Sequence, residues 1–270
     1  MGIFSPRYDK EGPGVEKDAP RKKGIARFFE LMSRDLSSLF LANLLTCIGF
    51  LPMACLVFLG FLSGSLPFLI AGAVIGGLFA GPALAGMYDT VLRALRDEPG
   101  YWWSTYRRAF RQNVKASLLP GILYCTVVTA QIYLVWYCVQ SMSAGHVSAA
   151  LWAATVLNLL LFHMLFVYMW PQIVLLDQPL LLTLKNSLSC MLAFLPRTLA
   201  AALVVVLVGG ILISMLPSGL LLVLLFGFWL PCEVSCQILY NDLNRTFHIE
   251  ENIRKLHESQ WAAKNASEES

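Results

Sequence analysis

Glu233 is the residue of this sequence with the clearest capacity for chemistry, because it is a carboxylate within an apolar segment. It is the only charged residue from Thr198 to Tyr240, and it follows Pro231 by two positions. A carboxylate at the centre of a membrane helix costs roughly 2.5–3.5 kcal/mol, and a proline frees a backbone carbonyl from the helix. One interpretation is a buried proton or cation site. The other is a structural carboxylate near the inner interface, helped by snorkelling or by an arginine partner.

Four further polar residues also fall within apolar segments. Such residues usually hydrogen-bond to a neighbouring helix, and the alternative is that they line a pathway for a small solute. With Glu233 they form the candidate intramembrane polar site, which comprises Glu233, His163, Asn158, Gln131 and Asn43.

Other combinations of reactive side chains give weaker signals. Cys232 and Cys236 lie four residues apart, but two thiols without a nearby histidine favour packing over metal binding. Asp89 precedes Arg93 by four residues, a spacing that predicts an ordinary surface ion pair. The sequence has no P-loop, no GxSxG elbow, no HExxH helix and no carboxylates paired at catalytic spacing. We therefore expect no enzymatic activity, no catalytic residue, no metal and no cofactor.

The distribution of charge predicts the elements that carry these residues. Of 270 residues, 57% are hydrophobic and only 14% are charged. Asp89 is the only charged residue from Leu36 to Thr90. The only ionisable Asp, Glu, Lys, Arg or His residues between positions 116 and 176 are His146 and His163. Because a helix needs about 20 residues to cross the hydrocarbon core, these long uncharged stretches predict membrane-spanning helices.

The expected architecture is an all-α membrane protein with about six transmembrane helices arranged as three hairpins. A short amphipathic cytoplasmic helix precedes each hairpin, beginning near Ile25, Tyr101 and Pro179. Gly72 and Gly76 form a GxxxG pattern that favours close helix packing. The predicted spans cover residues 39–62, 67–92, 117–140, 149–176, 198–216 and about 220–240. A flexible tail over residues 1–24 and a polar tail over residues 249–270 flank this membrane domain of residues 25–248.

Aromatic and basic residues alternate between the second and third spans. Both kinds of side chain suit the membrane interface, where rings and cations reach the headgroups. The lipid bilayer is therefore the expected partner, and the flanking spans argue against nucleic acid. The interfacial set comprises Trp102, Trp103, Tyr106, Arg107, Arg108 and Arg111, with Phe110 and Lys115 beside it.

Orientation follows from the basic residues. All 20 lysines and arginines fall in the two tails or the two longer loops, and the three short loops have none. The positive-inside rule then predicts that both termini are cytoplasmic.

The sequence from Gly81 to Ser117 contains a recognisable motif. It begins with Gly81-Pro82-Ala83, reaches Tyr88, passes an acidic turn and ends in an aromatic segment with Phe110, Asn113 and Lys115. This pattern resembles the YesL-like family of bacterial membrane proteins, a domain of unknown function, with weaker similarity over roughly residues 25–248. The resemblance implies a bacterial cytoplasmic membrane protein and no catalytic residue. Since members often accompany carbohydrate uptake systems, it also implies an accessory role there.

Two functional hypotheses follow. The first is a non-enzymatic accessory or regulatory protein that associates with a carbohydrate transport complex through its basic cytoplasmic face. The alternative is a small-solute transporter or channel that uses the intramembrane polar residues. Neither the substrate nor the oligomeric state follows from the sequence.

Overall fold

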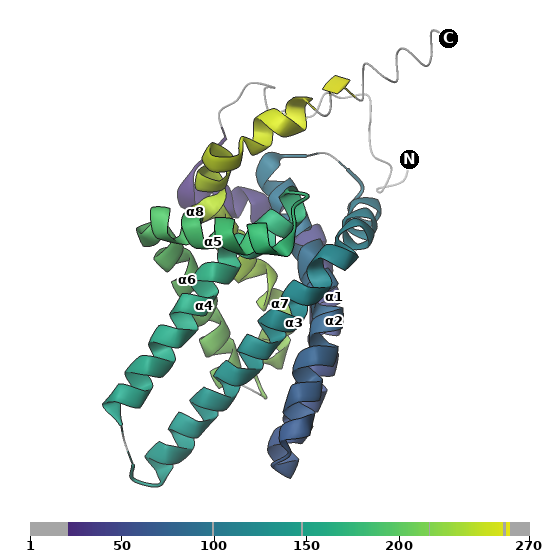
Figure 1. Ribbon diagram of the computed structural model, residues 1–270. Coiled ribbons are helices and arrows are strands. Elements are labelled where there is room, and N and C mark those ends of the chain that lie inside the picture. Colours follow the sequence, from purple (N-terminus) through teal and green to yellow (C-terminus); the bar gives the residue numbers. More distant parts are fainter. Residues whose placement is uncertain (1–20, 99, 147, 216, 256–257, 260–270) are drawn as a thin grey trace.

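The computed structural model describes residues 21–98, 100–146, 148–215, 217–255 and 258–259 (Figure 1). Within these ranges the chain is helical and contains no strand. Residues 1–20 of the predicted flexible tail lie outside the described residues, and of the predicted polar tail residues 249–255 are helical. The helices are α1 (Gly24–Ser63), α2 (Leu66–Arg96), α3 (Trp102–Ser143), α4 (Ala149–Leu175), α5 (Leu180–Ala193), α6 (Leu195–Ser214), α7 (Leu220–Phe226) and α8 (Trp229–Phe247).

Five of these helices, α1, α2, α3, α4 and α6, are long and apolar enough to cross a membrane. A sixth span results if α7 and α8 are counted together, although they are bent by 42°. Large apolar side chains such as Ile48 and Phe58 remain 64% and 63% exposed, as contact with lipid requires. The predicted all-α class is confirmed, with several helices long and apolar enough to span a membrane.

The lead-in segments differ from the prediction in two of three cases. Residues 25–38 form one continuous helix of 40 residues with the first span, and α3 likewise extends over 42 residues. No glycine or proline stands between these lead-ins and their spans, so nothing interrupts the helix. Only α5 is separate, since Pro179 precedes it and Pro196 begins the following helix.

The last predicted span is a broken helix. It separates into α7 and α8 at Gly227 and Phe228. Pro231, in the first turn of α8, has no N–H to continue the hydrogen-bond ladder from α7. A break within the hydrocarbon region requires other groups to satisfy the freed backbone.

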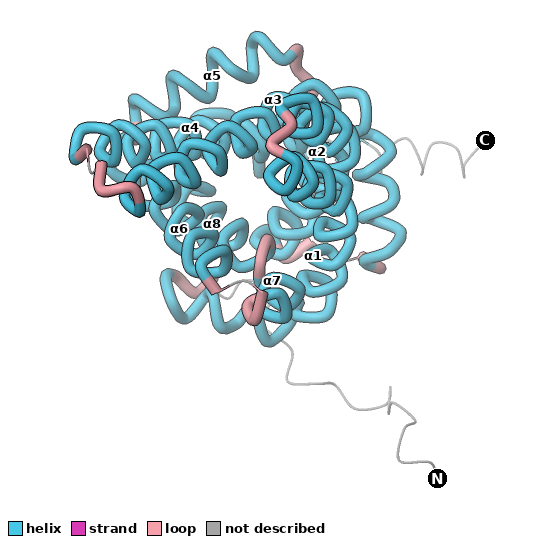
Figure 2. Tube along the Cα trace, turned by 90° about the horizontal axis from the view of Figure 1, so that it is seen from below, coloured by secondary structure: helices cyan, strands magenta, loops and turns pink. Residues whose placement is uncertain are grey.

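Helices α1, α2 and α3 pack most closely, and Figure 2 shows α2 and α3 beside one another when the bundle is seen from below. Glycines make this approach possible. A Cβ added at Gly81 would lie 3.1 Å from the Cα of Gly121, and one at Gly72 would lie 3.0 Å from Val57 Cγ2 of α1. In Figure 1 the turns after α1 and α3 lie at the bottom. We call the opposite end, where α1 begins and α2 ends, the charged end.

Candidate functional site

An arginine cluster at the charged end surrounds Asp97. This residue ends α2 in the left-handed conformation, with φ 60°. Its carboxylate accepts hydrogen bonds from Arg27 Nη2 at 2.8 and 2.9 Å, from Arg21 Nε at 3.0 Å, and from Arg34 Nη1. The N-terminal part of α1 is thereby fixed to the end of α2.

The same three arginines also satisfy the last carbonyls of α2, which have no partner within the helix. Their positive charges complement the negative end of the helix dipole. Arg34 Nη2 lies 2.8 Å from the Ala94 oxygen, Arg27 Nη2 lies 3.0 Å from the Leu95 oxygen, and Arg21 Nη2 lies 3.1 Å from the Arg96 oxygen.

The arginines around Asp97 favour the ionised form of its carboxylate. Partial burial raises the pKa of Asp97, but the hydrogen bonds and charges of Arg34 and Arg27 outweigh it. The pKa therefore lies below its usual value of 3.8.

A second set of ion pairs extends this network. Arg93 contacts Asp89 at 2.8 Å and Glu98 at 2.8 Å. The predicted Asp89–Arg93 pair is present, but the side chain of Asp89 is only 9% exposed, so it is not the surface pair expected. Arg21 also reaches Glu250 at 2.5 Å, which ties the helical residues after α8 to the cluster.

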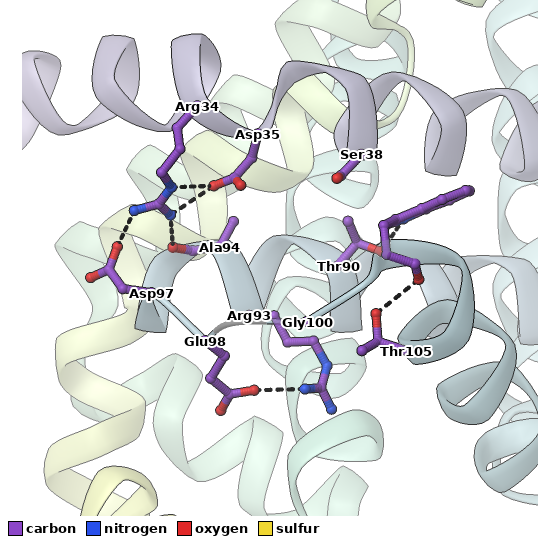
Figure 3. Close-up of a pocket in the computed structure, with 11 residues that line it drawn as sticks. Arg34, Asp35, Ser38, Thr90, Arg93, Ala94, Asp97, Glu98, Gly100 and Thr105 are labelled. Carbon is purple, nitrogen blue, oxygen red and sulfur yellow. Dashed lines mark hydrogen bonds and ion pairs between the residues drawn. The ribbon is translucent and has the colours of Figure 1, made fainter. Parts of the chain in front are cut away.

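A polar pocket of about 310 Å³ opens beside the cluster (Figure 3). It lies between α1, the end of α2 and the beginning of α3, and charges of both signs line it. Its walls include Arg34, Asp35, Ser38, Thr90, Arg93, Asp97, Gly100, Trp102 and Thr105.

The residues of the sequence motif meet at the α2–α3 interface. Gly81 faces Ser117 and Gly121, Pro82 is buried, and the Tyr88 ring stacks on Trp170 at 6.2 Å. Phe110 packs against the core half-buried, Asn113 Nδ2 donates to the Ala109 oxygen of its own helix at 2.9 Å, and Lys115 is exposed. These positions build the bundle and do not converge on a pocket.

Asn43 of α1 closes the break between α7 and α8. Its Oδ1 accepts from the backbone N–H groups of Phe228 at 2.8 Å and Trp229 at 3.2 Å. Its Nδ2 donates to the carbonyls of Val223 at 3.1 Å and Leu224 at 2.7 Å. One buried amide therefore caps the end of α7 and the start of α8.

Glu233, one turn into α8, has the opposite surroundings. The residue is 1% exposed, and within the described part of the chain neither carboxylate oxygen has a hydrogen-bond partner. The charged groups that act on it are Asp35 and Arg27 of α1. Arg27 forms ion pairs with Glu30 and Asp97, and among the described residues no arginine pairs directly with Glu233.

Comparison with known proteins identifies part of the chain. A family model described as "Protein of unknown function, DUF624" matches residues 39–135. We call residues 39–135 the DUF624 region, after the family model that they match. YesL-like proteins are members of this family, so the predicted family resemblance is confirmed. No curated protein and no solved structure matches the chain.

The DUF624 region comprises the span of α1, all of α2 and most of α3. It contains Asn43, Gln131 and the whole motif, whereas Glu233, His163 and Asn158 lie outside it. Asn43 is thus one of the residues of the DUF624 region that contact the broken helix, together with Cys47, which donates to the Val223 oxygen, and Phe50, which stacks on Phe228.

The candidate polar residues do not assemble into one site. His163 Nδ1 lies 2.8 Å from the Leu159 oxygen of its own helix, and Asn158 is half-buried on α4. Gln131 is buried in the DUF624 region, and its Nε2 has no hydrogen-bond partner. No hydrogen bond joins two of the five residues, and within the described ranges no three His, Cys, Asp or Glu side chains could hold a metal ion.

The interfacial set is divided between two faces of α3. Tyr106 is only 4% exposed, and its ring packs on Gly86 of α2, so it does not lie at the headgroup surface as expected. Trp102 is half-buried, with Nε1 3.4 Å from Thr90 Oγ1. Trp103 and Arg107, Arg108 and Arg111 are exposed.

Sequence reasoning missed two polar contacts. Gln172 is fully buried, and its Nε2 donates to Ser187 Oγ at 2.9 Å, which joins α4 to α5. Asp242, 3% exposed, pairs with Arg197 between α8 and α6. A glutamine within an apolar run was a usable signal for Gln172, whereas nothing local indicated the partner of Asp242.

Proposed function

We propose that this chain is a non-enzymatic accessory or regulatory protein of a carbohydrate transport system in the bacterial cytoplasmic membrane. Its helices form three hairpins, and both termini and the charged end face the cytoplasm. The positive-inside rule supports this orientation. The DUF624 region supports the family context from which the transport association is inferred.

One contrast carries the proposal. The intramembrane polar residues are dispersed over four helices, whereas the charged end has an ordered ion-pair network around Asp97 and an open polar pocket. A protein that moves a solute needs polar groups that meet along a path. A protein that docks a partner needs a rigid surface with specific polar groups.

Photo-crosslinking in native membranes tests this proposal. A benzophenone amino acid replaces Ser38 in the pocket, and His146 at the opposite end serves as the control position. We expect mass spectrometry to identify a carbohydrate transport subunit attached at position 38 and not at position 146. Absence of such a subunit at position 38, with the protein folded and expressed, contradicts the proposal.

A second candidate function, a proton- or cation-coupled transporter, is favoured by Glu233 alone. Both of its oxygens are buried without a partner next to a broken helix, the arrangement that transporters use for coupling sites. Glu233→Gln separates the two functions, because an amide keeps the volume but cannot exchange a proton. We expect the variant to be at least as stable as the parent and fully functional. A folded Glu233→Gln protein that loses solute uptake in vesicles would instead establish the transporter.

A further inference from the structure

The first turns of α3 carry a row of cations along one face. Four basic and two uncharged polar residues recur at spacings of three and four, so they share one side of the helix. They are Ser104, Arg107, Arg108, Arg111, Gln112 and Lys115. The opposite side is buried, since Tyr106, Ala109 and Ser117 are 4%, 3% and 0% exposed. We call this exposed row the α3 cationic stripe.

The cationic stripe differs from the five arginines around Asp97 and Glu98. Arg21, Arg27, Arg34, Arg93 and Arg96 are all paired with carboxylates. Across the described ranges, Arg107, Arg108, Arg111 and Lys115 have no ion pair and no hydrogen bond from their side chains. Four neighbouring positive charges without an internal counter-charge attract anions from outside the bundle.

A shallow depression lies along the α3 cationic stripe. It measures about 380 Å³ and is lined by Trp103, Ser104, Arg107, Arg108, Arg111 and Gln112. Guanidinium groups bind phosphate oxygens through paired N–H donors, and an exposed tryptophan suits the headgroup region.

The same face of α3 continues as exposed apolar surface. Leu119 and Leu123 follow Lys115 at intervals of four and are 60% and 37% exposed. At 1.5 Å per residue, Arg107 to Lys115 and Lys115 to Leu123 each span about 12 Å. The surface is therefore cationic at one end and apolar at the other, which matches one amphipathic molecule lying along the helix.

We propose that the α3 cationic stripe is a binding site for an anionic phospholipid. Arg107, Arg108, Arg111 and Lys115 contact its phosphate, and its acyl chain lies along Leu119 and Leu123. A water-soluble acidic protein would leave those two leucines uncovered, which favours a lipid as the occupant. The inference needs only a membrane-embedded bundle and is independent of the proposed transport association.

Native mass spectrometry of the full chain with defined lipids tests the site. The probes are palmitoyl-oleoyl phosphatidylglycerol and the zwitterionic phosphatidylcholine with the same chains. We expect the parent to retain the anionic lipid preferentially and Arg107→Gln/Arg111→Gln to lower its affinity roughly 30-fold, at about 1 kcal/mol per basic residue. Arg254→Gln/Lys255→Gln is the matched control, since it removes two exposed charges beyond α8. It should retain the lipid as the parent does.

Four outcomes would overturn the proposal. If both double variants lost the lipid equally, the effect would be one of general charge. If Arg107→Gln/Arg111→Gln retained the anionic lipid while its unfolding curve showed it to be folded, the stripe would not be the lipid site.

If glycerol phosphate at millimolar concentration displaced the lipid, the stripe would bind a free phosphate compound. If Arg107→Gln/Arg111→Gln lost a co-purifying acidic protein but kept the lipid, the stripe would bind a protein partner.

Discussion

Asn43 and Glu233 are both polar side chains in apolar segments, yet the fold treats them differently. Asn43 makes four backbone hydrogen bonds, whereas the carboxylate oxygens of Glu233 make none. The sequence could indicate both positions because each stands in a run without charge. It could not distinguish them, since the partners of Asn43 lie 180 to 186 positions away.

Asn43→Ala should destabilise the bundle. The change removes Asn43 Oδ1 as the acceptor for the N–H groups of Phe228 and Trp229 and Nδ2 as the donor to the Leu224 carbonyl, at a cost of about 2 kcal/mol. Thermal unfolding in detergent measures the loss. Asn158→Ala is the matched control because its side chain is only half-buried, and it should change stability little. Equal effects of the two substitutions would show that Asn43 does not hold the break.

Asp97→Asn should lower stability in a pH-dependent way. Because the pKa of Asp97 is lowered in the fold, its carboxylate stabilises the protein above the usual value of 3.8 and loses this effect as pH falls through the folded pKa. Asparagine tolerates the left-handed backbone, so the variant removes mainly the charge.

The parent should therefore unfold at a higher temperature than Asp97→Asn at neutral pH, and the difference should shrink on acidification between about pH 5 and about pH 2. Unfolding curves in detergent over this range measure it. A constant difference at all pH values would mean that the charge of Asp97 is not what stabilises the charged end.

At the scale of the helix, the sequence predicted the spans well because length and absence of charge determine them. The continuity of α1 and α3 was not predicted, since a change from amphipathic to apolar composition does not by itself end a helix. The sequence predicted a lead-in segment near Pro179 in the same way as the other two, and only here do prolines, Pro179 and Pro196, limit a separate helix. The break in the last predicted span is held by Asn43, which lies in α1. The sequence of the span itself therefore could not predict this contact.

Gly121→Ala should separate α2 from α3. A Cβ at this position would lie 2.6 Å from the Cα of Gly81, so the helices must move apart at a cost of about 1–3 kcal/mol. Gly209→Ala in α6 is the control, because no atom lies within 4 Å of its added Cβ. It should be neutral or slightly stabilising, since alanine favours helix. Comparable unfolding temperatures for the two variants would contradict the close α2–α3 contact.

At the scale of the whole molecule, charge is the feature that orders the bundle. The ion pairs of the described chain involve the beginning of α1, the end of α2, Arg197 with Asp242, and the residues around and after His248. The sequence predicted this asymmetry from the positions of its basic residues. It did not predict that three arginines converge on Asp97, because that pairing depends on how α1 crosses α2.

The proposed orientation predicts which end is accessible from outside the cell. His146→Cys should react with a membrane-impermeant maleimide in intact cells, and Arg254→Cys should react only after the cells are opened. The parent chain controls for its own thiols, of which Cys55 is exposed and Cys47 is half-buried. Labelling of Arg254→Cys alone in intact cells would reverse the orientation.

The amide clamp of Asn43 also constrains how the protein is made. A ribosome delivers the first span long before α7 and α8 exist, so Asn43 enters the membrane with its hydrogen bonds unmade. Until α7 and α8 are inserted, this amide lies in an apolar segment without its backbone partners. The first span therefore reaches its fully hydrogen-bonded state only after the last helices have been made.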